Sequence, residues 1–275
     1  MAEVKTGSLE AEALTVSLGG HAVLHEVSLS ARAGEVTVIA GPNGCGKSTL
    51  IRALCREISS RGGLRINGRD MRGMKAWQLA ALRAVLPQET SVAFPFRVGE
   101  IVALGLRAVS HQTPRDLVSH ALEAVGLGGF EGREINALSG GERQRVHLAR
   151  VLTQIWDPVG PDGPRWLILD EPVSSLDIRY QLGVMEIARD YARRGGGVIA
   201  VMHDLNLSAM YADRMAFMHK GKVAAFGPTP EVMRAEVLNA VFDCALRPNH
   251  VPPEGDFVLP QSVVSSAAPI AIAAE

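Results

Sequence analysis

Residues 41–49 form a glycine-rich segment whose composition suits phosphate binding. An apolar run at residues 36–40 precedes it and an amphipathic pattern over residues 50–58 follows it, which predicts a strand, a loop and a helix. A loop with little side-chain bulk can surround a phosphate with backbone N–H groups while the helix N-terminus points at it. An ordinary glycine turn is the competing interpretation. The predicted phosphate-binding residues are Gly41, Pro42, Asn43, Gly44, Cys45, Gly46, Lys47, Ser48 and Thr49.

Two side chains of this segment could bind a nucleotide and its metal ion, in addition to the backbone N–H groups. Lys47 would reach the β- and γ-phosphates of a nucleotide as a point charge, and the Ser48 hydroxyl could ligate Mg²⁺.

An acidic pair, Asp170 and Glu171, follows the apolar residues 167–169, where a buried strand would end at the ligand-binding edge of a sheet. Asp170 would hold Mg²⁺, directly or through water, and Glu171 would orient and deprotonate an attacking water. Alone, the pair also fits a solvated turn. Together with Lys47 and Ser48 it indicates nucleotide hydrolysis.

Residues 138–142, Leu-Ser-Gly-Gly-Glu, open a pattern typical of a helix. Ser139, Gly140 and Gly141 would place a hydroxyl and free N–H groups at a positive helix end, which suits a second phosphate. The spacing of Ser139 and Glu142 also fits a capping box, and both interpretations can hold together.

The composition limits the class of protein. The 275 residues carry a formal net charge of -1, so a strongly basic nucleic-acid-binding surface is not indicated, and we expect no nucleic-acid partner. The three cysteines form no CxxC pair, and no apolar run is long enough to cross a bilayer. We expect a cytosolic chain.

The elements that position these residues predict an α/β fold. Strand patterns on both sides of Gly19-Gly20 and at residues 64–66 indicate an antiparallel sheet, and apolar runs at 166–169 and 198–202 indicate buried parallel strands. Helical spacing over approximately 98–152 indicates an inserted α-helical subdomain. We predict one domain over residues 1–247 and an extended or disordered tail over 248–275.

The order of these motifs resembles that of ATP-binding-cassette (ABC) ATPases, whose core is a P-loop NTPase fold. The resemblance covers nearly the whole chain up to about residue 247 and implies ATP and Mg²⁺ as cofactors. It also implies a homodimer, in which Ser139, Gly140 and Gly141 of one copy cover the γ-phosphate bound by the other.

The resemblance assigns roles to three further residues. Gln88 would sense Mg²⁺ and the attacking water, His203 would contact the γ-phosphate, and Asp177 would lie at the dimer seam. Alternatives stay open, because Gln88 could be a surface residue, His203 could be structural, and Asp177 could cap the helix that begins near residue 178.

The chain departs from the family at the adenine-stacking position, which we assign to Val16. Its side chain offers adenine an apolar contact in place of an aromatic ring, so we expect weaker stacking.

Transport is the implied purpose of hydrolysis, because the chain lacks the long coiled coils and zinc modules of the DNA-repair relatives. A chain with no membrane span would dock on permease subunits, at the cytoplasmic face of the inner membrane. Phe94 and Phe96 could form an apolar socket for a permease helix, or could pack the helical subdomain onto the core.

A finer resemblance is to the ATP-binding subunits of bacterial haem importers. It is carried by residues 85–88 and 93–98, the proline-rich segment 156–165, and residues 201–207. It implies that a periplasmic haem-binding protein acts on this chain only indirectly, through the permease. A ferric siderophore or cobalamin importer ATPase and a non-transport cytosolic ABC ATPase are the alternatives.

Overall fold

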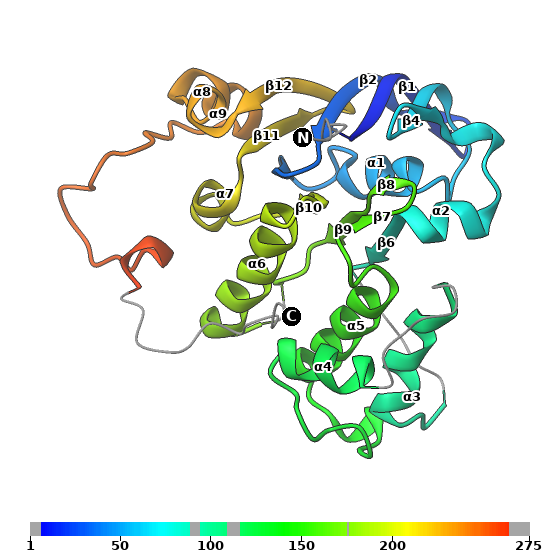
Figure 1. Ribbon diagram of the computed structural model, residues 1–275. Helices are drawn as coiled ribbons and strands as arrows, with labels where there is room; N and C mark the ends of the chain where they lie inside the picture. The colour runs from blue at the N-terminus through cyan, green and yellow to red at the C-terminus, as the bar shows by residue number, and fades with distance from the viewer. Residues whose placement is uncertain (1–6, 89–93, 109–115, 175, 264–275) are drawn as a thin grey trace, which may run out of the picture.

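A six-stranded sheet forms the centre of the computed structural model, which describes residues 7–88, 94–108, 116–174 and 176–263 (Figure 1). Its strand order is β12-β11-β3-β10-β9-β6, in which β12 is antiparallel to β11 and the other neighbours are parallel. The strands are β3 (Val36–Ala40), β6 (Arg83–Leu86), β9 (Trp166–Asp170), β10 (Gly197–Val201), β11 (Arg214–His219) and β12 (Lys222–Pro228). Strands β3, β9 and β10 are buried throughout, as their apolar runs predict.

Both faces of this sheet are covered, and alternate residues of its strands enter two separate cores. Ile39 packs with α1 (Lys47–Leu54) and the N-terminal strands, whereas Val38 packs in the core that contains α6 (Ile178–Arg193). Helices α7 (Leu205–Tyr211), α8 (Thr229–Val232) and α9 (Ala235–Phe242) complete the C-terminal half.

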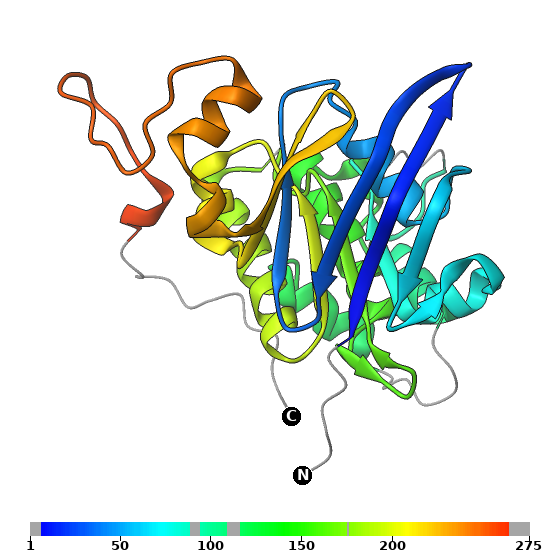
Figure 2. The same cartoon turned by 90° about the horizontal axis from the view of Figure 1, so that it is seen from above.

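A second, antiparallel sheet is built mainly from the N-terminal strands, in the order β2-β1-β4-β5. Its strands are β1 (Ser8–Leu18), β2 (His21–Arg32), β4 (Arg61–Ile66) and β5 (Arg69–Asp70). Figure 2 shows the long β1–β2 hairpin lying beside the central sheet. The short helix η1 (Met71–Gly73) and α2 (Ala76–Leu82) lead from this sheet to β6.

Helices α3, α4 and α5 gather at the lower right of Figure 1, apart from α1. The helical elements between β6 and β9 are α3 (Val98–Ala103), η2 (Leu104–Ala108), α4 (Leu117–Ala124), η3 (Ile135–Ala137) and α5 (Gly140–Gln154). The proline-rich segment that follows forms the hairpin of β7 (Val159–Gly160) and β8 (Gly163–Pro164).

The C-terminal segment beyond α9 runs as an extended arm to the short helix η4 (Pro260–Ser262). The arm returns to the body of the molecule there, because Gln261 Nε2 donates a hydrogen bond to Asn206 O of α7 at 2.8 Å. Across the described parts of the chain, no helix has both the length and the apolar character needed to span a bilayer.

The mixed α/β architecture, with parallel strands in one sheet and antiparallel strands in another, confirms the predicted fold class. The division into a domain of residues 1–247 and a tail stays a prediction.

Candidate functional site

The phosphate loop between β3 and α1 is fixed by contacts that require glycine. Gly41 has φ +149°, and a Cβ there would lie 2.3 Å from Met218 O, so a larger residue would collide with β11. Gly46 is the N-cap of α1 in a left-handed conformation with φ 106°. Gly221 N donates to Cys45 O at 3.0 Å, which ties the loop to the β11–β12 turn.

Lys47 is held inside this loop. Its side chain is 5% exposed, and Nζ donates to Gly41 O at 2.9 Å and to Pro42 O at 3.1 Å. The ammonium group is therefore positioned at the loop without an ion pair in the described part of the chain. Burial also raises the pKa of the Cys45 thiol, which keeps this side chain neutral.

Asp170 ends β9 as a buried carboxylate that is suited to a cation. Burial, with a smaller contribution from Glu171, raises the pKa of Asp170 to about 6. Its Oδ1 is buried and has no hydrogen-bond partner within the described residues. An unpartnered buried carboxylate oxygen is costly unless something binds it, so Asp170 and the Ser48 hydroxyl fit the oxygen-ligand chemistry of Mg²⁺.

Glu171 holds the centre of the site, at a left-handed backbone position with φ 52°. Gln88 Nε2 donates to its Oε2 at 2.8 Å, and His203 Nε2 lies 2.6 Å from its Oε1. The three predicted catalytic side chains are thus brought together. They follow β6, β9 and β10, which are adjacent parallel strands whose carboxyl ends meet at one sheet edge.

The segment that opens α5 forms the predicted capping box. Ser139 accepts a hydrogen bond from Glu142 N at 3.3 Å, and Ser139 N donates to Glu142 Oε2 at 2.8 Å. The hydroxyl and backbone donors of Ser139 lower the pKa of Glu142. Ser139 and Gly140 remain exposed at the helix end.

Gln144, one turn further along α5, links this segment to the acidic pair. Its Nε2 donates to Pro172 O at 2.8 Å and to Glu171 O at 3.4 Å. The sequence pattern does not indicate a role for Gln144, because a polar residue on an amphipathic helix usually faces solvent.

Asp177 is exposed and is the N-cap residue of α6, but its side chain makes no capping hydrogen bond. Ser175, two residues earlier, lies outside the described residues. Asp177 therefore lies at the predicted N-cap position, but its side chain does not cap the helix. Its place at a dimer seam stays a prediction.

The assignment of Val16 as the adenine contact is wrong. Val16 is 1% exposed and packs in the core between the antiparallel sheet and α1, so no ligand can stack on it. Leu18 is 40% exposed at the end of the same strand. It lies at the hairpin tip, where it pairs with His21. Leu18 is thus the better candidate.

Phe94 and Phe96 do not pack the helical subdomain onto the core. They are 67% and 43% exposed and contact one another edge to face, with ring centroids 6.3 Å apart. An exposed aromatic pair is typical of a surface that binds a partner.

Comparison with known proteins agrees with this geometry. The family model described as "ABC transporter" matches residues 24–174. A protein of Rhizobium johnstonii named "Hemin import ATP-binding protein HmuV" is 51% identical over 94% of this chain and 99% of its own length. A protein of the same name from Jannaschia sp. is 51% identical over 92% of this chain and 94% of its own length.

Solved structures show the same fold. A bacterial Atm1-family ABC exporter with ATP bound has a TM-score of 0.73 and 27% identity, over 86% of this chain and 42% of that chain. A structure described as the ATP binding subunit of an ABC transporter has a TM-score of 0.73 and 22% identity, over 86% and 96% of the two chains. With the phosphate loop, acidic pair and capped Ser-Gly-Gly segment in place, the chain belongs to the ABC transporter family of ATP-binding proteins.

Proposed function

We propose that this chain is the ATP-hydrolysing subunit of a bacterial hemin importer. The observation that carries the proposal is the identity of about half of all residues, over nearly the full length, with proteins named for hemin import. The catalytic machinery belongs to the family as a whole, so the hemin assignment rests on this likeness and on no residue that would touch hemin.

The site residues would have two roles in hydrolysis, the binding of ATP with Mg²⁺ and the transfer of a proton from water. The phosphate loop and Lys47 would bind the β- and γ-phosphates of ATP. Mg²⁺ held by Asp170 and Ser48, with Gln88 near it, would neutralise charge on the phosphate oxygens. Glu171 would orient the attacking water and accept its proton at a carboxylate oxygen, while His203 would contact the γ-phosphate.

Catalysis is proposed to need two copies of the chain. The exposed Ser139 and Gly140 open α5, which lies in the lower group of helices in Figure 1, whereas the phosphate loop lies at α1 above them. A second copy would bring its own Ser139, Gly140 and Gly141 over the γ-phosphate, with Asp177 at the seam. ATP binding and dimer closure would then be linked free energies.

The closing dimer would drive a membrane permease from its cytoplasmic face. Phe94 and Phe96 would supply part of the apolar contact, because they are exposed and lie just after the segment that contains Gln88. A periplasmic hemin-binding protein would act through the permease and would not touch this chain. The chain itself would be a peripheral protein of the inner membrane.

Uptake into vesicles tests the whole proposal. Vesicles would contain the chain, its copurified permease and the binding protein, with hemin, a ferric siderophore and cobalamin as separate cargoes and Glu171→Gln as the inactive control. ATP-dependent hemin uptake that the control lacks is the expected result. Uptake of another cargo would overturn the hemin assignment alone, and failure to copurify with any membrane component would favour a non-transport ABC ATPase.

A further inference from the structure

Glu171, the proposed base, has a backbone conformation that its neighbours must hold. Its φ of 52° lies in the left-handed region, which a residue with a long side chain rarely adopts. A residue keeps such a conformation only where the surrounding contacts fix it. The direction in which the Glu171 carboxylate points depends on these contacts, because the side chain leaves the backbone at this residue.

Contacts from three places hold the backbone of Glu171. Its N–H donates to Val201 O of β10 at 3.2 Å. The Ser174 hydroxyl, in the segment that leads to α6, donates to its carbonyl oxygen at 3.2 Å. From α5, Gln144 Nε2 donates to Pro172 O at 2.8 Å and to Glu171 O at 3.4 Å. This last contact crosses from the helical subdomain to the end of β9.

The acceptors fix the orientation of the Gln144 amide. Both are backbone carbonyl oxygens, so the NH₂ group and not the amide oxygen must face them. The amide lies at a small apolar space whose lining includes Leu86, Leu148 and Val184. This space has no room for a water molecule, so water could not replace the donor if the side chain kept its volume but lost its NH₂ group.

Helix α5 is anchored at this turn, which makes Gln144 a fixed support. The next residue, Arg145, is buried, and its guanidinium donates to Val125 O at 3.1 Å. The same guanidinium covers Tyr180 of α6, with its Cζ 3.8 Å from the ring centroid. Gln144 therefore reaches Glu171 from a position that packing sets.

We propose that Gln144 is a positioning residue for ATP hydrolysis, which holds the backbone of Glu171 and Pro172 so that the Glu171 carboxylate faces the attacking water. This inference rests on the proposed function, in which Glu171 is the base. Gln144 would touch neither ATP nor the water, and would act on the chemical step through Glu171. Its removal should therefore lower kcat and leave the affinity for ATP unchanged.

The test measures ATP turnover and ATP affinity of the full chain assembled with its permease. Gln144→Met keeps the volume of the side chain and removes the donor. It should lower kcat about tenfold with an unchanged Kd for ATP, because a small misplacement of a reacting group slows the chemical step. Gln144→Glu, which turns a carboxylate oxygen toward two carbonyl groups, should lower kcat at least as far. Full turnover by Gln144→Met, or a loss of ATP affinity as large as the loss of turnover, would overturn the proposal.

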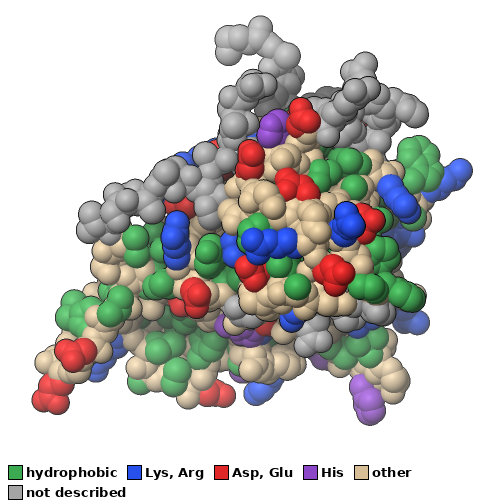
Figure 3. Space-filling view, turned by 90° about the horizontal axis from the view of Figure 1, so that it is seen from below, with side chains coloured by type: hydrophobic (Ala, Val, Ile, Leu, Met, Phe, Trp, Pro, Cys, Tyr) green, Lys and Arg blue, Asp and Glu red, His purple; other side chains and the backbone are tan. Residues whose placement is uncertain are grey.

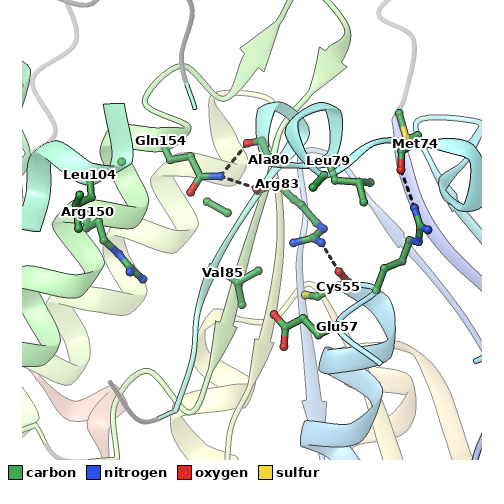
Figure 4. A pocket seen from close by; sticks show the side chains of 14 residues that line it. Cys55, Glu57, Met74, Leu79, Ala80, Arg83, Val85, Leu104, Arg150 and Gln154 are labelled. Carbon is green, nitrogen blue, oxygen red and sulfur yellow. Dashed lines mark hydrogen bonds between the residues drawn. The ribbon is translucent and has the colours of Figure 1, made fainter. Parts of the chain in front are cut away.

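Gln154 provides a matched control on the same helix. Figure 4 shows its Nε2 donating to Ala80 O and Arg83 O, at 2.8 Å and 3.0 Å, which is the same kind of contact at the other end of α5. Gln154→Met should lower Tm by a similar amount to Gln144→Met and should keep the kcat of the parent. Equal losses of kcat in the two variants would show that any loosening of α5 slows hydrolysis, and the specific role of Gln144 would fail.

A double-mutant cycle with Glu171→Gln tests whether Gln144 acts through the base. Gln144→Met should not further lower the residual single-turnover rate of Glu171→Gln, because the group that it positions is already gone. Losses that multiply would contradict the proposal. Normal turnover by Glu171→Gln alone would overturn the base assignment within the proposed function. An inactive Glu171→Gln beside a fully active Gln144→Met would overturn this inference alone.

Discussion

His203 Nε2 lies 2.6 Å from Oε1 of Glu171, and Gln88 Nε2 donates to the other carboxylate oxygen. Both oxygens of the proposed base are therefore engaged by side chains. Each carboxylate oxygen can accept more than one hydrogen bond, so a water that gives its proton to Glu171 would share one of these oxygens with Gln88 or His203.

Glu171→Gln should lower steady-state ATP turnover by about a hundredfold or more while ATP still binds, because the amide cannot accept the proton. The variant should accumulate as a dimer with trapped ATP, measured by size exclusion and by the nucleotide content of the dimer fraction. Glu254→Gln, an exposed residue of the C-terminal arm, is the control. Normal turnover by Glu171→Gln would remove Glu171 from the role of base.

Lys47→Ala should abolish detectable ATP binding or lower turnover by more than about a hundredfold, because it removes the one charge that the phosphate loop itself carries. Binding of a fluorescent ATP analogue and phosphate release would be measured together. The exposed Lys75→Ala serves as the control. Full ATPase activity of Lys47→Ala would contradict the assignment of the phosphate loop.

The sequence predicted the strands that lead into the candidate site, because β3 and β9 are uniformly apolar. The glycine loop and the acidic pair are local patterns that follow these strands, and their roles in binding and hydrolysis stay predictions. Gln144 was missed because its contacts with Pro172 and Glu171 join segments that are far apart in sequence. The pairing of Gln88 with Glu171 depends on β6 lying next to β9, which no local pattern encodes.

Val16 was assigned from the family's adenine-stacking position, and that assignment does not show whether the side chain is buried. In a regular strand, residues 16 and 18 lie on the same face, so equal exposure would be expected. The pairing of β1 with β2 shifts register between Val16 and Ser17, and this irregularity leaves Val16 buried and Leu18 exposed. Alternation alone does not reveal such a shift.

Leu18→Tyr should tighten ATP binding about tenfold, because stacking of a base on an aromatic ring contributes ~1–3 kcal/mol. Val16→Tyr should instead destabilise the fold by ~1–3 kcal/mol, because the buried position has no room for an aromatic ring in place of the smaller valine side chain. ATP titration and urea unfolding of both variants check the pair. Unchanged ATP affinity in Leu18→Tyr would exclude Leu18 as the adenine contact.

Replacing Phe94 and Phe96 together by alanine should abolish stable assembly with the permease and leave ATP binding intact. Truncating a central aromatic residue of an interface often costs ~2 kcal/mol or more, and both rings are exposed in the free chain. Copurification with the permease measures assembly, and Phe257→Ala, an exposed phenylalanine of the C-terminal arm, is the control. A stable complex of the double variant would rule out this contact.

Stability should fall with decreasing pH because of His147, which is 3% exposed on α5 with both ring nitrogens unpartnered within the described chain. Burial, then the charge of Arg150, lowers the pKa of His147 from 6.5 to about 4. Between these values the unfolded chain binds the proton and the folded chain does not, so acidification favours unfolding. The full effect is roughly 3 kcal/mol, at 1.36 kcal/mol for each pKa unit.

Urea unfolding at pH 5 and pH 7.5 measures this dependence on the free energy of unfolding. His147→Leu should reduce the difference between the two pH values, because leucine fills a similar buried volume and binds no proton. His120→Leu, at an exposed histidine of α4, should keep the difference of the parent. An unchanged difference in His147→Leu would assign the acid sensitivity to other groups. It would also imply that the folded chain admits water or a proton to the ring of His147.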